Sequence, residues 1–306
     1  MKTALAPMQD VTDLAFMRTL SRVGSLPDFF VTPYFRSTPT TCALAEQNER
    51  CIQENTTGRP IWAQLAGSDA AALVRDARML DAAAVAGINL NAGCPSPLVN
   101  RHGAGAGLLR DLPNFHRVLQ ALRAALPQGR FSVKCRLGWA DESEFAAILD
   151  LLAEAVPDMV MVHARTRKEL YGGTPHREAF RRAVQALSCP VLVNGDLNSA
   201  ADARAAMEEA GAAGVMVGRG AVRNPYLFRE LAGGPPPTAA EMNAYYAALL
   251  EETGRILARY SEKGHCNRMK KYLTFCYPDM QPEQEYALRR CTEVAQMAQL
   301  LHYEPR

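Results

Sequence analysis

The chain has 306 residues, a formal net charge of +2 and eight cysteines, and 48% of its residues are hydrophobic. It contains no apolar run long enough to cross a bilayer, and its early polar residues do not fit a signal peptide. The near-neutral charge argues against bulk DNA binding but permits a local basic face. The cysteines show neither a C-x-x-C pair nor zinc spacing, so we expect a cytoplasmic protein without a metal. Because no apolar run is long enough to cross a bilayer, we expect no membrane partner.

Short apolar runs alternate with Ala- and Leu-rich stretches of helical spacing. Each run is continuous and hydrophobic, as expected of parallel strands that are buried on both faces. Eight such units in about 230 residues predict an α/β protein with a closed (β/α)8 TIM barrel and favour it over an open, doubly wound sheet. The expected strands are 3–8, 29–34, 61–67, 87–94, 131–138, 158–165, 190–196 and 214–220.

The segments between and after these strands predict the helices. We expect helices at 68–86, 112–126, 141–156 and 198–210, with Ser68 and Asn198 as N-caps and Gly211 as a C-cap. The Gly-Gly-Pro-Pro-Pro run at 233–237 marks a boundary. Beyond it, helical patterns at 238–262, 265–277 and 282–302 lack any strand signal. We therefore predict a barrel domain over 1–233 and a small all-helical domain over 238–306.

Residues 87–111 contain the most distinctive pattern of the chain. An apolar strand ends at Gly93-Cys94-Pro95, and a glycine-rich loop with Arg101 and His102 follows. This layout fits a reactive cysteine on a barrel rim, although a buried free thiol at a strand end fits it equally well. The glycine spacing in the loop is not that of a dinucleotide fingerprint.

Polar and ionisable side chains recur at the ends of the other strands. Such groups are costly inside apolar strands unless they face a ligand or one another. Glycines after the last two strands stand where phosphate sites commonly form in barrels, with tight turns as the alternative explanation. The polar ends include Gln9, Tyr34 with Arg36, Gln64, Asn91 with Cys94, Lys134 with Arg136, His163 with Arg165, Asn194-Gly195-Asp196 and Gly218-Arg219-Gly220.

With these residues in place, the chain resembles the tRNA-dihydrouridine synthases, flavin enzymes that reduce selected uridines in tRNA. The loop at 99–109 and the segment Arg268-Met269-Lys270 look closest to the branch typified by bacterial synthase C. The matching motifs are A-P-M at 6–8, Q-L at 64–65, L-N-x-G-C-P-S at 90–96, V-K-x-R at 133–136, V-H-x-R-T at 162–166, N-G-D at 194–196 and V-G-R-G at 217–220.

The resemblance implies an FMN cofactor, NADPH or NADH as electron donor, and Cys94 as the catalytic acid. A flavin gains negative charge when it is reduced, and Lys134 would supply the compensating cation. The implied FMN contacts are Pro7, Met8, Gln9, Gln64, Lys134, His163, Asn194, Gly195, Asp196, Gly218 and Arg219. The implied substrate contacts are Asn91, Lys134, Arg136 and Tyr171 for the uracil, and Arg36, Arg268 and Lys270 for tRNA.

The expected reaction adds hydride to C6 of a uridine and a proton from Cys94 to C5. A thiol near its reference pKa of about 8.5 is protonated at neutral pH and can donate. Two alternatives stay open: a dihydroorotate-dehydrogenase-like enzyme that acts on a free pyrimidine, and a non-catalytic barrel that only binds RNA. The helical tail and the basic loops favour a tRNA partner, and no DNA partner is expected. A monomer is the default expectation. An ordinary solvated helix face is the alternative for Arg268 and Lys270.

Overall fold

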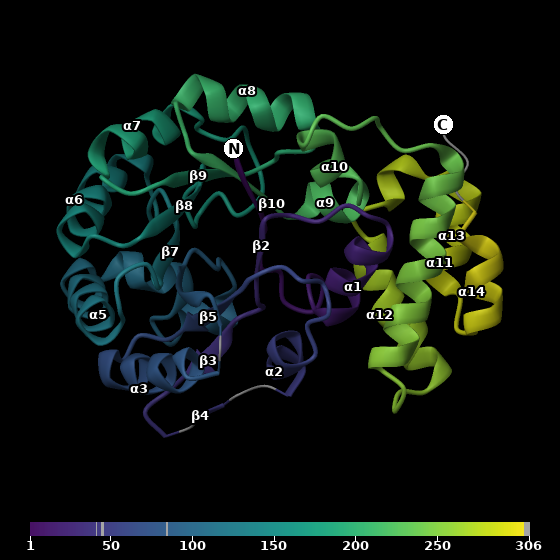
Figure 1. The fold of residues 1–306 in the computed structure, drawn as a ribbon, viewed down its shortest axis with the longest axis horizontal. Helices are drawn as coiled ribbons and strands as arrows, with labels where there is room; N and C mark the ends of the chain where they lie inside the picture. Colours follow the sequence, from purple (N-terminus) through teal and green to yellow (C-terminus); the bar gives the residue numbers. More distant parts are fainter. Residues whose placement is uncertain (41, 44–45, 84, 303–306) are drawn as a thin grey trace.

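The computed structural model describes residues 1–40, 42–43, 46–83 and 85–302, and its main feature is a closed barrel of parallel strands (Figure 1). Closure follows from the pairing of the first strand with the last and of the second with the third barrel strand. The expected barrel is confirmed. Its strands are β1 (Lys2–Leu5), β2 (Phe29–Val31), β5 (Ile61–Ala66), β6 (Gly87–Ala92), β7 (Phe131–Arg136), β8 (Met159–His163), β9 (Val191–Asn194) and β10 (Gly214–Val217).

Two short strands were not predicted and lie at the barrel rim. β3 (Phe35–Ser37) pairs in parallel with the end of β5, and β4 (Cys42–Ala43) pairs antiparallel with β3. The expected strand at 29–34 ends early, at Val31. Proline has no N–H for a ladder hydrogen bond, so Pro33 interrupts the run and the chain resumes as a separate strand.

Side chains alternate between two apolar layers along the strands. In β8, Met159 and Met161 belong to a small cluster with residues of β1, β2, β9 and β10, whereas Val160 and Val162 belong to the larger cluster that includes helix residues. This alternation explains why the strands read as continuous apolar runs, since one face packs inside the barrel and the other against helices.

Helices surround the barrel (Figure 1). Asp69 and Ser199 cap their helices through side-chain oxygens that accept from Ala72 N and Asp202 N at 2.8 and 3.1 Å, so the expected caps Ser68 and Asn198 were wrong by one residue. Gly211 is the C-cap of its helix as expected, with φ of 68°. The helices are α1 (Leu14–Arg22), α2 (Glu46–Gln53), α3 (Ala70–Asp81), α4 (Pro97–Asn100), η1 (Gly105–Arg110), α5 (Leu112–Ala125), η2 (Glu142–Glu144), α6 (Phe145–Ala155), α7 (Glu178–Ala186), α8 (Ala200–Ala210), α9 (Arg219–Arg223) and α10 (Leu227–Leu231).

The C-terminal part is helical and packs beside α1 (Figure 1). The segment expected as one helix at 282–302 is two helices, because Cys291 adopts an extended ψ of 135°. None of the helices in the described ranges is long and apolar enough to span a membrane. The C-terminal elements are α11 (Ala239–Ile256), α12 (Glu262–Leu273), η3 (Tyr277–Asp279), α13 (Pro282–Arg290) and α14 (Val294–Leu300).

Candidate active site

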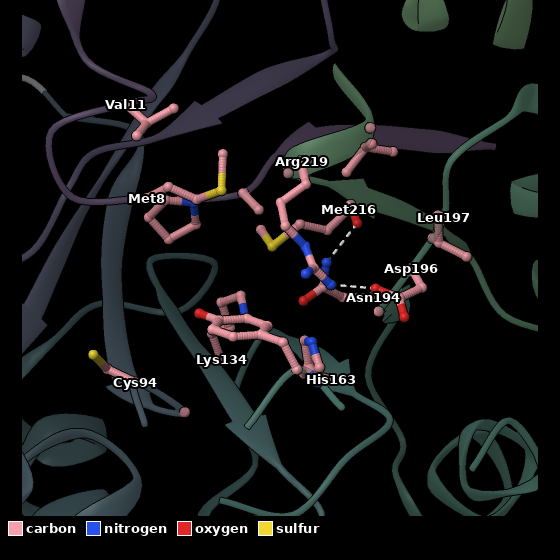
Figure 2. A pocket seen from close by; sticks show the side chains of 18 of the residues that line it. Met8, Val11, Cys94, Lys134, His163, Asn194, Asp196, Leu197, Met216 and Arg219 are labelled. Carbon is pink, nitrogen blue, oxygen red and sulfur yellow. Dashed lines mark hydrogen bonds and ion pairs between the residues drawn. The ribbon is translucent and has the colours of Figure 1, made fainter. Parts of the chain in front are cut away.

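A cavity of about 380 Å³ opens at the C-terminal ends of the barrel strands, and Figure 2 shows the side chains that converge on it. Cys94 lies on the opposite side of this cavity from Asp196 and Leu197 in that view. We call it the main cavity. It brings together most of the residues singled out from the sequence: Pro7, Met8, Gln9, Asn91, Cys94, Lys134, Arg136, His163, Tyr171, Asn194, Gly195, Asp196, Gly218 and Arg219.

Cys94 is held by hydrogen bonds on both sides of its peptide unit. The backbone N–H groups of Gly93 and Cys94 donate to Asn91 Oδ1 at 3.1 and 2.8 Å, and Asn100 Nδ2 donates to the Cys94 carbonyl at 2.8 Å. A Cβ at Gly105 would come within 2.9 Å of that carbonyl, so the loop approaches too closely for a larger residue. The backbone of Cys94 is therefore held by both the strand end and the returning loop.

The same surroundings keep the Cys94 thiol protonated. Burial raises its pKa above the ordinary value, although the backbone N–H of Ser96 and the cations of Lys134 and Arg136 act in the opposite direction. A cysteine whose pKa lies above its usual range carries its proton at neutral pH. Cys94 can consequently act as a proton donor and is poorly suited to be a thiolate nucleophile.

Lys134 projects from β7 beside Asn91 of β6, its register partner. Burial, followed by repulsion from Arg136, lowers the Lys134 pKa to about 8. Burial and the nearby Arg136 and Lys134 cations also lower the His163 pKa well below its usual range, so the ring is neutral. Within the described residues, His163 Nδ1 is buried without a hydrogen-bond partner. Among the described residues the Lys134 ammonium has no recorded hydrogen bond or ion pair, so this cation and the unsatisfied ring nitrogen of His163 fit a polar ligand that carries or gains negative charge.

Arg136 joins the Cys94 strand end to the loop that follows β8. Its Nε donates to the Gly93 carbonyl at 2.9 Å, and its Nη1 donates to the carbonyls of Thr166 and Leu170, each at 2.7 Å. Burial lowers its pKa to about 10, so the guanidinium still carries its charge at neutral pH. Although Arg136 lines the cavity, its recorded hydrogen bonds position two loops.

Tyr171 lies over the cavity between two guanidinium groups. The carbons at the centres of Arg219 and Arg136 stand 4.7 and 5.4 Å from its ring centroid, and the His163 ring meets it edge-on at 6.4 Å. Arg165 holds this loop by donating to the carbonyls of Gly172 and Gly173, each at 2.7 Å. Because Tyr171 remains 54% exposed, it offers a flat aromatic surface at the cavity mouth.

The ends of β9 and β10 form the opposite wall. Gly195 has φ of 122°, and a Cβ at Gly218 would stand 3.3 Å from the Ala6 Cβ and 3.4 Å from the Met8 sulfur. These glycines leave backbone exposed to the cavity in a way that suits a phosphate group. The Arg219 guanidinium, however, is paired with the Asp196 carboxylate, which also binds Arg165 at 2.5 Å. This ion pair holds the Arg219 guanidinium at the cavity wall, and its contact with the cofactor stays a prediction.

Four other expected site residues lie outside the main cavity. Gln64 is fully buried beneath it, where its side chain donates to Asn89 at 2.7 Å and accepts from Asn91 at 2.9 Å. Arg36 lines a neighbouring cavity. Arg268 is 7% exposed and pairs with Asp13 and Asp10 of the barrel, so its expected placement on a solvent-facing RNA surface is corrected. Lys270 is half-buried on α12.

Phe275 and Asn100 bear on the site but received no role from the sequence. Phe275 reaches the main cavity from the C-terminal helices, and nothing in the local sequence indicates that contact. Asn100 clamps the Cys94 loop, with its Nδ2 also donating to the Ala104 carbonyl at 3.0 Å and its Oδ1 accepting from Arg167 at 3.0 Å. Asn100 lies in the loop at 99–109 that carries the family resemblance, so the sequence marked the loop but not the contacts of this side chain.

Comparison with known proteins adds a family to this geometry. The family model described as dihydrouridine synthase (Dus) matches residues 4–304. A tRNA-dihydrouridine(16) synthase of Ralstonia nicotianae is 33% identical over 312 residues, covering 98% of this chain and 94% of that protein. A probable tRNA-dihydrouridine synthase of Rhodobacter capsulatus is 33% identical over 273 residues, covering 85% and 83%. A variant of NCR from Zymomonas mobilis shares the fold, with a TM-score of 0.55 at 15% identity over 78% of this chain and 88% of that one.

Proposed function

Because the chain belongs to the dihydrouridine synthase family, we propose that it reduces a uridine of tRNA to 5,6-dihydrouridine, with FMN as cofactor and NADPH or NADH as reductant. The observation that carries this proposal is the main cavity, in which a protonated thiol, the Lys134 ammonium and a neutral imidazole face one space; the imidazole Nδ1 has no hydrogen-bond partner among the described residues. Those groups match a reaction that needs a proton donor and stabilisation of developing negative charge.

The residues of the main cavity fit both the phosphate and the ring of a flavin. The glycines at 195 and 218 leave room for a phosphate against backbone, and Met8 packs beside Gly218. Lys134 and His163 would hold the polar edge of the ring. When bound, the flavin would supply the hydride that adds to C6 of the uracil. The relatives' names support this assignment over a free-pyrimidine dehydrogenase.

The protein's own part in the chemistry is proton delivery and orientation. Cys94 would donate the thiol proton to C5 of the uracil as hydride arrives at C6, so the ring gains one hydride and one proton. Asn91 orients the Cys94 backbone, and Lys134 would balance the negative charge that develops on the base. The target base must leave its stack to reach this cavity, as in other enzymes that act on bases.

We also infer that the target is the uridine at position 16, because relatives that bear this name match nearly the whole chain. The test is to map dihydrouridine in tRNA from a parent strain, a strain that lacks this gene, and that strain complemented with the wild-type gene. The modification should vanish from position 16 in the deletion strain and return on complementation. Loss at another position refutes the position alone, and unchanged dihydrouridine at every position refutes the activity.

A further inference from the structure

A second cavity of about 210 Å³ lies beside the main cavity, and the two linings share Tyr34. We call it the flanking cavity. Cys94 and Pro95 line the main cavity, whereas Leu98 and Val99 of the same loop line the flanking one. The loop that carries the proton donor therefore has a cavity on either side. A ligand that occupied both would pass Tyr34.

The flanking cavity has the chemistry of a nucleotide site. Its apolar wall includes Gly67 and Ala104, and the half-buried ring of Tyr34 borders it. Ser37 is only 4% exposed, and its Oγ lacks a hydrogen-bond partner among the described residues. A flat apolar body that stacks on an aromatic ring and carries a hydrogen-bonding edge satisfies these groups, which is a description of a nucleobase.

The charged residues and the volume of the flanking cavity restrict which ligand it can hold. Arg36 is exposed at the rim and suits a phosphate, while Asp69 is occupied as the N-cap of α3 through its bond to Ala72 N. The cavity volume falls below the roughly 300–1,000 Å³ of pockets that enclose drug-sized ligands. One base fits this space better than a dinucleotide, so the site is matched to a single residue of a longer strand.

We propose that the flanking cavity binds the base directly next to the target uridine in an unpaired stretch of tRNA. Tyr34 stacks on this base, Ser37 Oγ bonds its edge, and Arg36 contacts its phosphate. The proposal rests on the proposed function, since it requires the target uridine to occupy the main cavity. Holding the neighbour keeps the target base from returning to its stack, so the site contributes to substrate binding.

The test uses the FMN-loaded protein and three tRNA transcripts: intact, abasic on the 5′ side of the target uridine, and abasic on the 3′ side. The wild-type protein should lose roughly 10-fold in kcat/KM, mainly through KM, on one abasic transcript, as expected for one lost stacking contact. Leu98 is 57% exposed at the cavity mouth, so Leu98→Trp adds bulk there without altering the barrel core. The kcat/KM of that variant should fall roughly 10-fold on intact tRNA, and it should not fall further on the abasic transcript that impairs the wild type.

Met79→Trp is the matched control and should stay within about twofold of wild type on intact tRNA, because it adds similar bulk at an exposed position of α3 outside both cavities. Ser37→Ala tests the same site without added bulk. In this variant the ratio of kcat/KM on intact tRNA to kcat/KM on the abasic transcript should be smaller than in the wild type. Reduction of the bound flavin by NADPH without RNA checks that the main cavity is intact in each variant. The proposal is wrong if the missing base lowers kcat/KM by the same factor in every variant, or if it does not lower kcat/KM in the wild type. Failure of the wild type to reduce intact tRNA would instead refute the proposed function.

Discussion

Replacing Arg268 by Met should strongly destabilise the protein, because it breaks a buried junction between α12 and the β1–α1 connection. The Arg268 and Asp13 side chains are 8% and 9% exposed, and Arg268 also lies 3.2 Å from Asp10. Removing one partner of a buried ion pair costs about 3–5 kcal/mol, since the other charge is left uncompensated. Two contacts limit the loss: the Tyr272 hydroxyl still donates to Asp13 at 2.9 Å, and Lys271 still neutralises Asp10.

We therefore expect Arg268→Met to lower the free energy of unfolding by about 3 kcal/mol, the lower end of that range. Lys271→Met is the matched control, because it removes a neighbouring cation that pairs with Asp10 and whose side chain is 50% exposed. Exposed pairs contribute about 0–1 kcal/mol.

The assay is urea unfolding at neutral pH, followed by circular dichroism and by aromatic fluorescence as two separate probes. Cleavage by a protease within 233–237 would report separately on loosening between the barrel and the C-terminal helices. Equal effects of the two substitutions, or a cost near 1 kcal/mol for Arg268→Met, would refute the view that Arg268 acts through burial.

The remaining predictions concern the main cavity and the tRNA surface. Cys94→Ala should retain FMN, judged by the visible spectrum, and lose most turnover on unmodified tRNA; full activity would remove Cys94 from the mechanism. In the ligand-free protein, the Lys134 pKa of about 8 lies below its unfolded value, so the folded state binds fewer protons between pH 8 and 10 and the free energy of unfolding rises there by roughly 1 kcal/mol per pH unit. Lys134→Met should remove that rise in pH-dependent unfolding curves, and an unchanged slope would contradict the pKa. Lys270→Glu should weaken tRNA binding in a salt-dependent manner without changing the flavin spectrum, and unaltered binding would exclude a contact there.

The sequence alone determined the barrel and the location of its reactive end. Eight apolar strands that alternate with helices can bury both of their faces in a closed barrel or in an open sheet covered by helices on both sides. The regular spacing of the eight units favoured the closed barrel. Because parallel strands place all their C-terminal ends at one edge, residues far apart in sequence, such as Cys94 and Asn194, could be assigned to one site. That inference needs only strand direction, which the order of elements supplies.

Tertiary structure decided which polar side chains face the cavity. Gln64 was expected at a cofactor edge, but its position in β5 places it among Asn89 and Asn91, beneath the cavity. A strand residue alternates between faces, and its height within a closed barrel depends on the register with its neighbours. That register is a non-local property, so the local pattern does not contain it.

The charged residues of the C-terminal helices show the same limit more clearly. Arg268 and Lys270 stand two positions apart and look alike in the sequence, yet one is buried against Asp13 and the other is half-buried on α12. Whether an arginine meets RNA or a carboxylate depends on the surface that packs against its helix. Here that surface comes from α1 and the loop before it, some 250 residues earlier in the chain.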